Sequence, residues 1–214
     1  MLKLAETLKG KGYNVRITKA LGGDGKDFVQ NELRKLLLAP EFPANDTESE
    51  ERLFAISDLR NLKQNYEFLA QDANNIVIQD RGMPSHISYC LAKNVSPANL
   101  VQYHGKLYDG YTELAWTYGG LNIILVPEDE KLAMERVIAR GAPVVKRLEN
   151  LDMQRGVITA MQKFDTSNEK SYDVIQYDKN EDFQNIVLTV TRDESIEAVT
   201  SKINLALKQN GVFE

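Results

Sequence analysis

The sequence has few of the residues that define several common classes of protein. Its single cysteine, Cys90, cannot form a disulfide within the chain, which is typical of a reducing cytoplasm. No apolar run approaches the roughly 20 residues of a membrane-spanning helix, and the opening MLKLAETLKG lacks the apolar segment of a signal peptide. The two histidines, His86 and His104, show no metal-ligand spacing with each other or with the cysteine. We therefore expect a cytoplasmic protein without a membrane segment.

A strong charge of either sign is also missing. The 31 acidic and 26 basic residues give a formal net charge of −5, and this balance indicates no surface for a nucleic-acid polymer. Basic residues gather only between Arg136 and Arg155. The length of 214 residues and the 43% hydrophobic content suit one domain with a sizeable core.

Two kinds of apolar pattern alternate along the chain. Short apolar runs predict strands at 13–18, 76–78, 121–126 and 185–190. Helical spacing predicts helices at 2–9, 28–38, 47–73, 86–93, 97–118, 129–140 and 153–164, and a last helix capped by Asp193 or Ser195. Strands that alternate with helices indicate an α/β fold with a parallel sheet between two helical layers. Ligands of such sheets bind beyond the carboxyl ends of the strands.

The segment KALGGDGKD, residues 19–27, has the composition of a phosphate-binding loop. Such a loop reads Gly-x-x-x-x-Gly-Lys-Ser/Thr, and its backbone amides surround the phosphates. The matching positions here are Ala20, Gly25, Lys26 and Asp27, so the first glycine and the metal-binding hydroxyl are both replaced. The segment is followed by two predicted helices without a strand between them. We favour a turn whose glycines adopt positive φ, with a degenerate phosphate loop as the alternative.

An ordered set of segments resembles the thymidylate kinase family from Met1 to about Leu207. The matching segments are MLKLAETLKGKGYNV, TKALGG, ELRKLLLAP, Leu53-Phe54-Ala55, VIQDRG, LNIILV with AMERVIARG, KRLEN and RDESIEAVTSKI. The resemblance implies a three-layer α/β/α fold of the P-loop nucleotide kinase type, with a lid at about 137–155. The family's ATP loop would end just before Met1. We expect that the natural protein starts upstream or, as the alternative, that it lacks the first strand and loop.

The resemblance also implies an activity and the residues that perform it. The enzyme would use ATP and Mg²⁺ to phosphorylate a deoxynucleoside monophosphate, with dTMP as the expected acceptor, and would form a homodimer through long helices such as 47–73. Asp80, Arg140 and Arg147 would be catalytic, and Asp80 would also hold the metal. The acceptor nucleotide would contact Phe54, Arg81, Ser85 and Tyr89, whereas Lys146 and Arg155 would contact ATP. Phe54 fits the apolar stripe of its helix equally well.

The sequence departs from the family pattern at three places. Ala20-Leu21 replaces Glu-Pro in the second loop, Asp58 replaces an arginine that reads the base, and Cys90 replaces a polar contact. These changes leave the base preference open. Two other functions also remain: an inactive homologue that binds nucleotide, or a kinase of another phosphorylated small molecule that uses Gly22–Asp27 as its phosphate loop.

Overall fold

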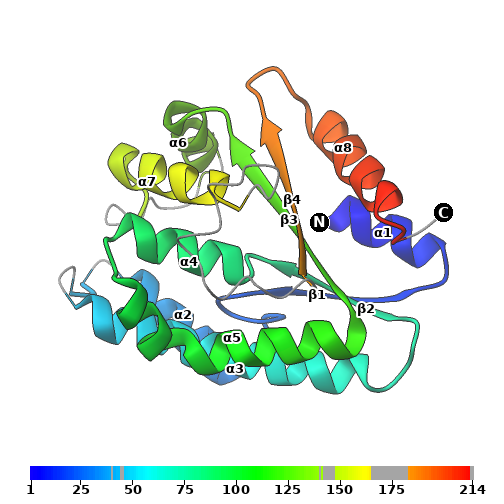
Figure 1. Ribbon diagram of the computed structural model, residues 1–214, viewed down its shortest axis with the longest axis horizontal. Coiled ribbons are helices and arrows are strands. Elements are labelled where there is room, and N and C mark those ends of the chain that lie inside the picture. The colour runs from blue at the N-terminus through cyan, green and yellow to red at the C-terminus, as the bar shows by residue number, and fades with distance from the viewer. Residues whose placement is uncertain (40, 44–45, 140, 142–147, 165–182, 213–214) are drawn as a thin grey trace.

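The chain has a mixed α/β architecture (Figure 1). The computed structural model describes residues 1–39, 41–43, 46–139, 141, 148–164 and 183–212. The strands within these ranges are β1 (Asn14–Lys19), β2 (Asn75–Asp80), β3 (Gly120–Pro127) and β4 (Phe183–Val190). The helices are α1 (Leu2–Gly10), α2 (Phe28–Leu38), α3 (Thr47–Leu69), α4 (Met83–Ala92), α5 (Pro97–Tyr118), α6 (Glu130–Ala139), α7 (Leu151–Gln162) and α8 (Ile196–Gln209).

The predicted elements are therefore present, with small changes at their ends. Helix α4 begins at Met83 rather than at His86, because Pro84 is tolerated in the first turn of a helix. Helix α7 begins at Leu151, where the Asn150 side chain accepts a hydrogen bond from the Met153 amide. Ser195, not Asp193, caps α8. Local capping chemistry accounts for these boundaries.

The strands form two small parallel sheets where the sequence predicts one. β1 pairs with β2 from Asn14–Asn75 to Lys19–Asp80, and β3 pairs with β4 from Gly120–Phe183 to Pro127–Val190. Among the described residues β2 and β3 form no ladder with each other. The end of β2 instead meets the side of β3, where a Cβ placed on Gly82 would lie 3.9 Å from Asn122 Oδ1. Each strand thus has one partner, so the prediction of a single sheet is wrong for this part of the chain.

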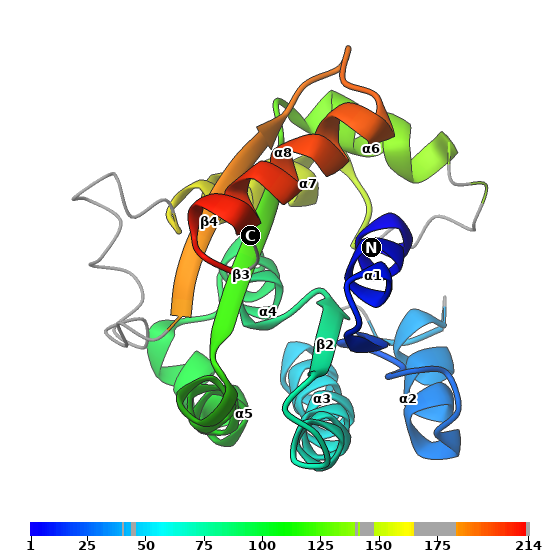
Figure 2. The ribbon, with the colours of Figure 1, turned by 90° about the vertical axis from the view of Figure 1, so that its right-hand side faces the viewer.

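Helices lie on both sides of the strands. Helices α1 and α8 lie side by side against β1 and β4, whereas α3 and α5 run together on the other side and contact β2 and β3 (Figures 1 and 2). No described helix combines the length and the apolar character that a membrane crossing requires.

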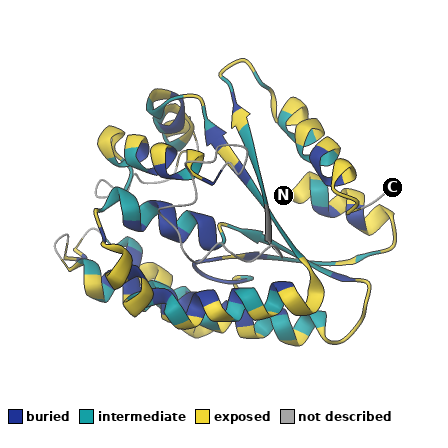
Figure 3. Ribbon diagram, in the orientation of Figure 1, coloured by how far each residue is buried: buried dark blue, intermediate teal, exposed yellow. Residues whose placement is uncertain are grey.

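The main core lies where α3, α4 and α5 meet β3 and α7. Its buried members are Ala55, Leu62, Met83, Ile87, Leu107, Tyr108, Tyr111, Ile124, Val126, Ala133, Ile158 and Phe164. Figure 3 shows many buried residues along α4 and much exposed surface on α1 and α8. A smaller cluster of Leu21, Leu37 and Phe42 lies beneath α2. Buried residues are therefore concentrated around α4 in the described chain.

The close approach of α7 to α4 depends on one glycine. A Cβ at Gly156 would lie 3.0 Å from Ala92 Cβ and 3.2 Å from Ala92 Cα, whereas a Cβ at Gly10 would meet nothing within 4 Å. Both glycines are helical, and the same substitution can be made at each.

We expect Gly156→Val to lower the free energy of unfolding by about 1–3 kcal/mol, because added methyl groups must push α7 away from the α4 backbone. The matched variant Gly10→Val should change it by no more than about 1 kcal/mol, since only the difference in helix propensity between glycine and valine applies there. Urea denaturation of both variants measures the difference. Equal losses would contradict the close packing of these two helices.

Candidate functional site

Two charged residues of opposite sign lie at the carboxyl end of β2. Asp80 is the last residue of the strand, and its register partner is Lys19, the last residue of β1. The Asp80 carbonyl accepts a hydrogen bond from the Ala20 amide at 3.0 Å, which fixes the turn after β1 against this end. Arg81 follows with an exposed side chain. Parallel strands thus bring Lys19, Asp80 and Arg81 together, at the edge where ligands of such sheets bind.

Arg81 has an unusual backbone. Its φ of 66° lies in the left-handed region, which non-glycine residues adopt at a cost of about 1–3 kcal/mol. The Gln79 side-chain amide donates to the Arg81 carbonyl at 3.2 Å and so contributes to holding this conformation. Strained backbone conformations cluster at functional sites.

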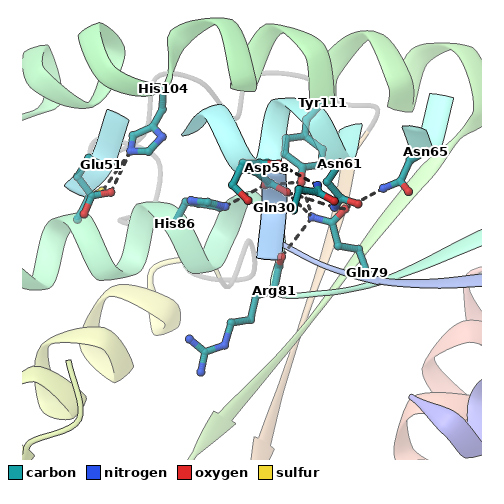
Figure 4. Close-up of polar contacts among 12 residues, drawn as sticks. Gln30, Glu51, Asp58, Asn61, Asn65, Gln79, Arg81, His86, His104 and Tyr111 are labelled. Atoms are coloured by element: carbon teal, nitrogen blue, oxygen red, sulfur yellow. Dashed lines mark hydrogen bonds and ion pairs between the residues drawn. The ribbon is translucent and has the colours of Figure 1, made fainter. Parts of the chain in front are cut away.

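The Arg81 side chain is held by an aromatic residue of α4. Its guanidinium carbon lies 5.4 Å from the centre of the Tyr89 ring, and its Nη1 lies 3.3 Å from the Tyr89 hydroxyl. Tyr89, Asp80 and Glu149 together raise the pKa of Arg81 above its ordinary value. Figure 4 shows the side chain pointing away from the buried polar residues, toward α7. The arginine is therefore a permanent, oriented cation, with Glu149 of the predicted lid nearby.

The glycine-rich segment has the structure of a turn. Gly22, Gly23 and Gly25 all have positive φ, and a Cβ at Gly23 would lie 2.1 Å from Gln30 Oε1. The amide of Gly23 donates to Lys19, and the amide of Gly25 donates to Gly22. A phosphate loop must present such amides to its ligand, so these bonds favour the turn interpretation.

The remaining part of the phosphate-loop pattern is also engaged. The Lys26 amide donates to Asp24, and Asp27 caps α2 through the Gln30 amide. The Asp27 carboxylate lies 2.6 Å from Arg60 and 2.9 Å from Gln64. Asp27 thus stabilises the start of α2 against α3, at the position where a phosphate loop has its metal-binding hydroxyl.

A buried polar network lies behind the end of β2 (Figure 4). Asp58 of α3 is fully buried, and its Oδ2 accepts hydrogen bonds from Tyr111 at 2.6 Å and from His86 Nε2 at 2.9 Å. Asn61 donates to Asp58 Oδ1 at 3.3 Å and to Gln79 Oε1 at 3.1 Å. Asp58 thus links α3, α4 and α5, and Gln79 connects the network to the Arg81 carbonyl.

The predicted substrate residues lie on or beside α4. Phe54 is half-buried and meets the His86 ring edge-on, with 4.3 Å between the ring centres. Ser85 lies in the first turn of α4, where its amide donates to the Gly82 carbonyl. Tyr89 lies one turn further along the same helix, against Arg81. Phe54 thus contacts α4 through His86, whereas Tyr89 belongs to α4 and contacts Arg81.

The predicted residues of the basic segment are described only in part. Arg140, Lys146 and Arg147 lie outside the described residues. Arg155 is exposed on α7 and forms ion pairs with Glu130 at 2.8 Å and with Asp152 at 3.4 Å. These contacts keep the Arg155 side chain on the surface between α6 and α7.

The structure also brings together three potential metal ligands that the sequence analysis missed. Glu51, Cys90 and His104 lie on α3, α4 and α5, and one ligand atom of each falls within 4.8 Å of the others. The ligands are 39 and 14 residues apart in sequence. This spacing matches no local metal motif, so only the packing of three helices could have revealed the group.

Comparison with known proteins gives no identification. The chain matches no protein-family model and no curated protein. Its function must therefore be argued from its own residues.

Removal of the Asp58 carboxylate should be among the most damaging substitutions. We expect Asp58→Ala to lower the free energy of unfolding by about 3–5 kcal/mol, because the buried His86 and Tyr111 would lose their shared acceptor. The matched variant Asp109→Ala, at an exposed position of α5, should change stability by no more than about 0.5 kcal/mol. Chemical denaturation measures both, and a small loss at Asp58 would contradict the network.

Tyr111 should make the fold sensitive to alkali. Burial and the neighbouring Asp58 carboxylate raise its pKa well above the ordinary value. The unfolded chain therefore loses the phenol proton first. The stability due to Tyr111 is complete below about pH 10 and falls above it by about 1.4 kcal/mol per pH unit. Tyr111→Phe should flatten the alkaline slope of unfolding free energy against pH. An unchanged slope would contradict this role.

Proposed function

We propose that the chain is a nucleoside monophosphate kinase similar to the thymidylate kinase family, and that Arg81 binds the phosphate of the acceptor nucleotide. The observation that carries the proposal is the end of β2, where an exposed arginine with strained backbone lies over Tyr89 and beside Asp80. An oriented guanidinium is suited to a phosphate because it donates two parallel hydrogen bonds.

The order of the elements supports the same proposal. Parallel strands, a glycine turn after β1 and a charged pair after β2 follow the order of the segments that resemble the family. Phosphoryl transfer requires positioned charge more than covalent chemistry, and this edge supplies cations and a carboxylate. The three-layer fold of P-loop kinases is part of the proposal.

The cofactors of the proposed reaction are ATP and Mg²⁺. Asp80 would hold the metal through its carboxylate, since oxygen atoms are the ligands that Mg²⁺ prefers. Mg²⁺ would supply charge neutralisation at the phosphates. Arg140 and Arg147 would stabilise the transferring group, and Lys146 and Arg155 would bind ATP.

The nature of the base is the least constrained part of the proposal. Asp58, which stands where the family has its base-reading arginine, is fully buried and already bonded to Tyr111 and His86. It is therefore unavailable to a base, and Phe54, Ser85 and Tyr89 are the remaining candidates for base contact. We propose dTMP as the first acceptor to test, within a panel of monophosphates.

The test measures nucleotide binding by calorimetry and turnover with Mg-ATP. We expect Arg81→Ala to weaken dTMP binding about 10- to 100-fold, since a charge-assisted hydrogen-bond pair is worth about 1.5–3 kcal/mol. Binding of thymidine, which lacks the phosphate, should stay unchanged. This comparison separates loss of a phosphate contact from general damage to the site.

A matched control is available in Arg52→Ala. Arg52 also lies over a tyrosine ring, at 5.3 Å from the centre of Tyr103, and pairs with Glu48 on the surface of α3. This variant should bind dTMP as the parent chain does. The proposal fails if no monophosphate binds, or if Arg81→Ala binds dTMP as tightly as Arg52→Ala. Binding without turnover would favour an inactive homologue that retains the nucleotide site.

A further inference from the structure

The three helices that surround Asp58 also bring together a second buried group of polar atoms. Glu51 Oε2 lies 3.1 Å from Cys90 Sγ and 3.1 Å from His104 Nε2, and the sulfur and the nitrogen are 3.7 Å apart. Cys90 and His104 have no exposed surface, and Glu51 is 4% exposed. Figure 4 shows Glu51 and His104 pointing toward each other from their helices. We infer that Glu51, Cys90 and His104 form a zinc-binding site that joins α3, α4 and α5.

The distances between the three ligand atoms suit a metal ion. Zinc binds oxygen and nitrogen at about 2.0–2.2 Å and sulfur at about 2.3 Å in tetrahedral geometry, so its ligand atoms are separated by roughly 3.3–3.7 Å. The three observed separations are within a few tenths of an ångström of this range. The two shorter separations, both 3.1 Å, would widen on metal binding.

The ligand types favour zinc over Mg²⁺ and Ca²⁺. Mg²⁺ and Ca²⁺ require oxygen ligands, whereas zinc binds sulfur, nitrogen and oxygen ligands. The site is thus chemically distinct from the proposed Mg²⁺ site at Asp80. Three protein ligands leave one position of a zinc tetrahedron for a water molecule.

The charges of the surroundings also suit a divalent cation. Lys93 lies 2.5 Å from Glu51 Oε1 and 2.6 Å from Glu50, so one carboxylate oxygen of Glu51 faces the lysine and the other faces the ligands. The formal charges of Glu50, Glu51 and Lys93 leave one negative charge. Zn²⁺ with a Cys90 thiolate brings the total to zero.

Metal binding changes the protonation of two ligands. The Cys90 thiol, which donates to Glu51 without metal, would release its proton to solvent as the sulfur–zinc bond forms. Neutral His104 would bind through Nε2 and carry its proton on Nδ1. One proton is thus released for each zinc bound.

The single cysteine makes the test specific. The full chain is freed of metal with a chelator, and Co²⁺ is added as a spectroscopic substitute for zinc. Because Cys90 is the only thiol in the sequence, an intense near-ultraviolet band from thiolate-to-cobalt charge transfer can come from no other residue. We expect this band at one cobalt per folded monomer, its loss on addition of Zn²⁺, and a higher unfolding temperature with Zn²⁺. Absence of the band from the folded parent chain would overturn the site.

Two variants locate the ligands. Cys90→Ala should abolish the band, and His104→Gln should weaken zinc binding about 100-fold or more, since loss of even an outer partner of a ligand costs 10- to 100-fold. The matched control is His86→Gln, which replaces the other buried histidine and should retain the band. Circular dichroism establishes folding of each variant. Unchanged zinc affinity in a folded Cys90→Ala or His104→Gln chain would contradict the assignment, and so would loss of the band from a folded His86→Gln chain. The outcome does not depend on kinase activity.

Discussion

The described part of the fold depends on one buried carboxylate. Asp58 receives hydrogen bonds from α4 through His86 and from α5 through Tyr111, while its own helix, α3, contributes Asn61. A buried charge is tolerated only when donors surround it, and removal of its partners is far more costly than loss of an exposed pair. The main core packs around this point, since Met83, Ile87, Leu107 and Tyr111 come from the same helices. Apolar burial supplies the stability there, whereas the Asp58 bonds specify how the three helices align.

The same network reaches the surface at the end of β2. Gln79 contacts Asp58 at 3.5 Å on one side and donates to the Arg81 carbonyl on the other. Its amide also bonds to the Tyr111 hydroxyl. The strained backbone of Arg81 is thereby attached to the interior, while the ring and hydroxyl of Tyr89 hold its guanidinium. A ligand held by Arg81 would gain from this attachment, because the arginine loses little freedom on binding.

Local patterns in the sequence were sufficient to predict the elements. Apolar spacing and cap residues located α2 and α5 to the residue, and the short apolar run of β2 was apparent without any tertiary information. The division into two sheets could not be predicted this way, since strand pairing is decided by contacts between distant segments. The position of Asp80 and Arg81 at a strand end was predictable. The left-handed backbone of Arg81 was not predictable. It is accompanied by a hydrogen bond from the Gln79 side chain, and no local sequence pattern indicates that bond.

The polar interior was the part that sequence patterns misrepresented. From the sequence, Asp58 was interpreted only as a replacement of a family arginine. Cys90 was interpreted as a small buried residue. Both meanings change once α3, α4 and α5 are aligned, because each helix then contributes a histidine, a carboxylate or a thiol to its neighbours.

The two buried carboxylates of α3 differ in what surrounds them. Asp58 Oδ2 accepts from a phenol and a histidine, and the phenol is a hydrogen-bond donor that binds zinc only rarely. Glu51 Oε2 instead faces a thiol, which becomes a metal ligand once deprotonated, and a histidine, which binds metal in its neutral form. The hydrogen bonds of the Asp58 group are satisfied while Tyr111 and His86 keep their protons. The Glu51 group can exchange a proton for a cation, and this difference in partner chemistry is why the zinc proposal concerns Glu51 and not Asp58.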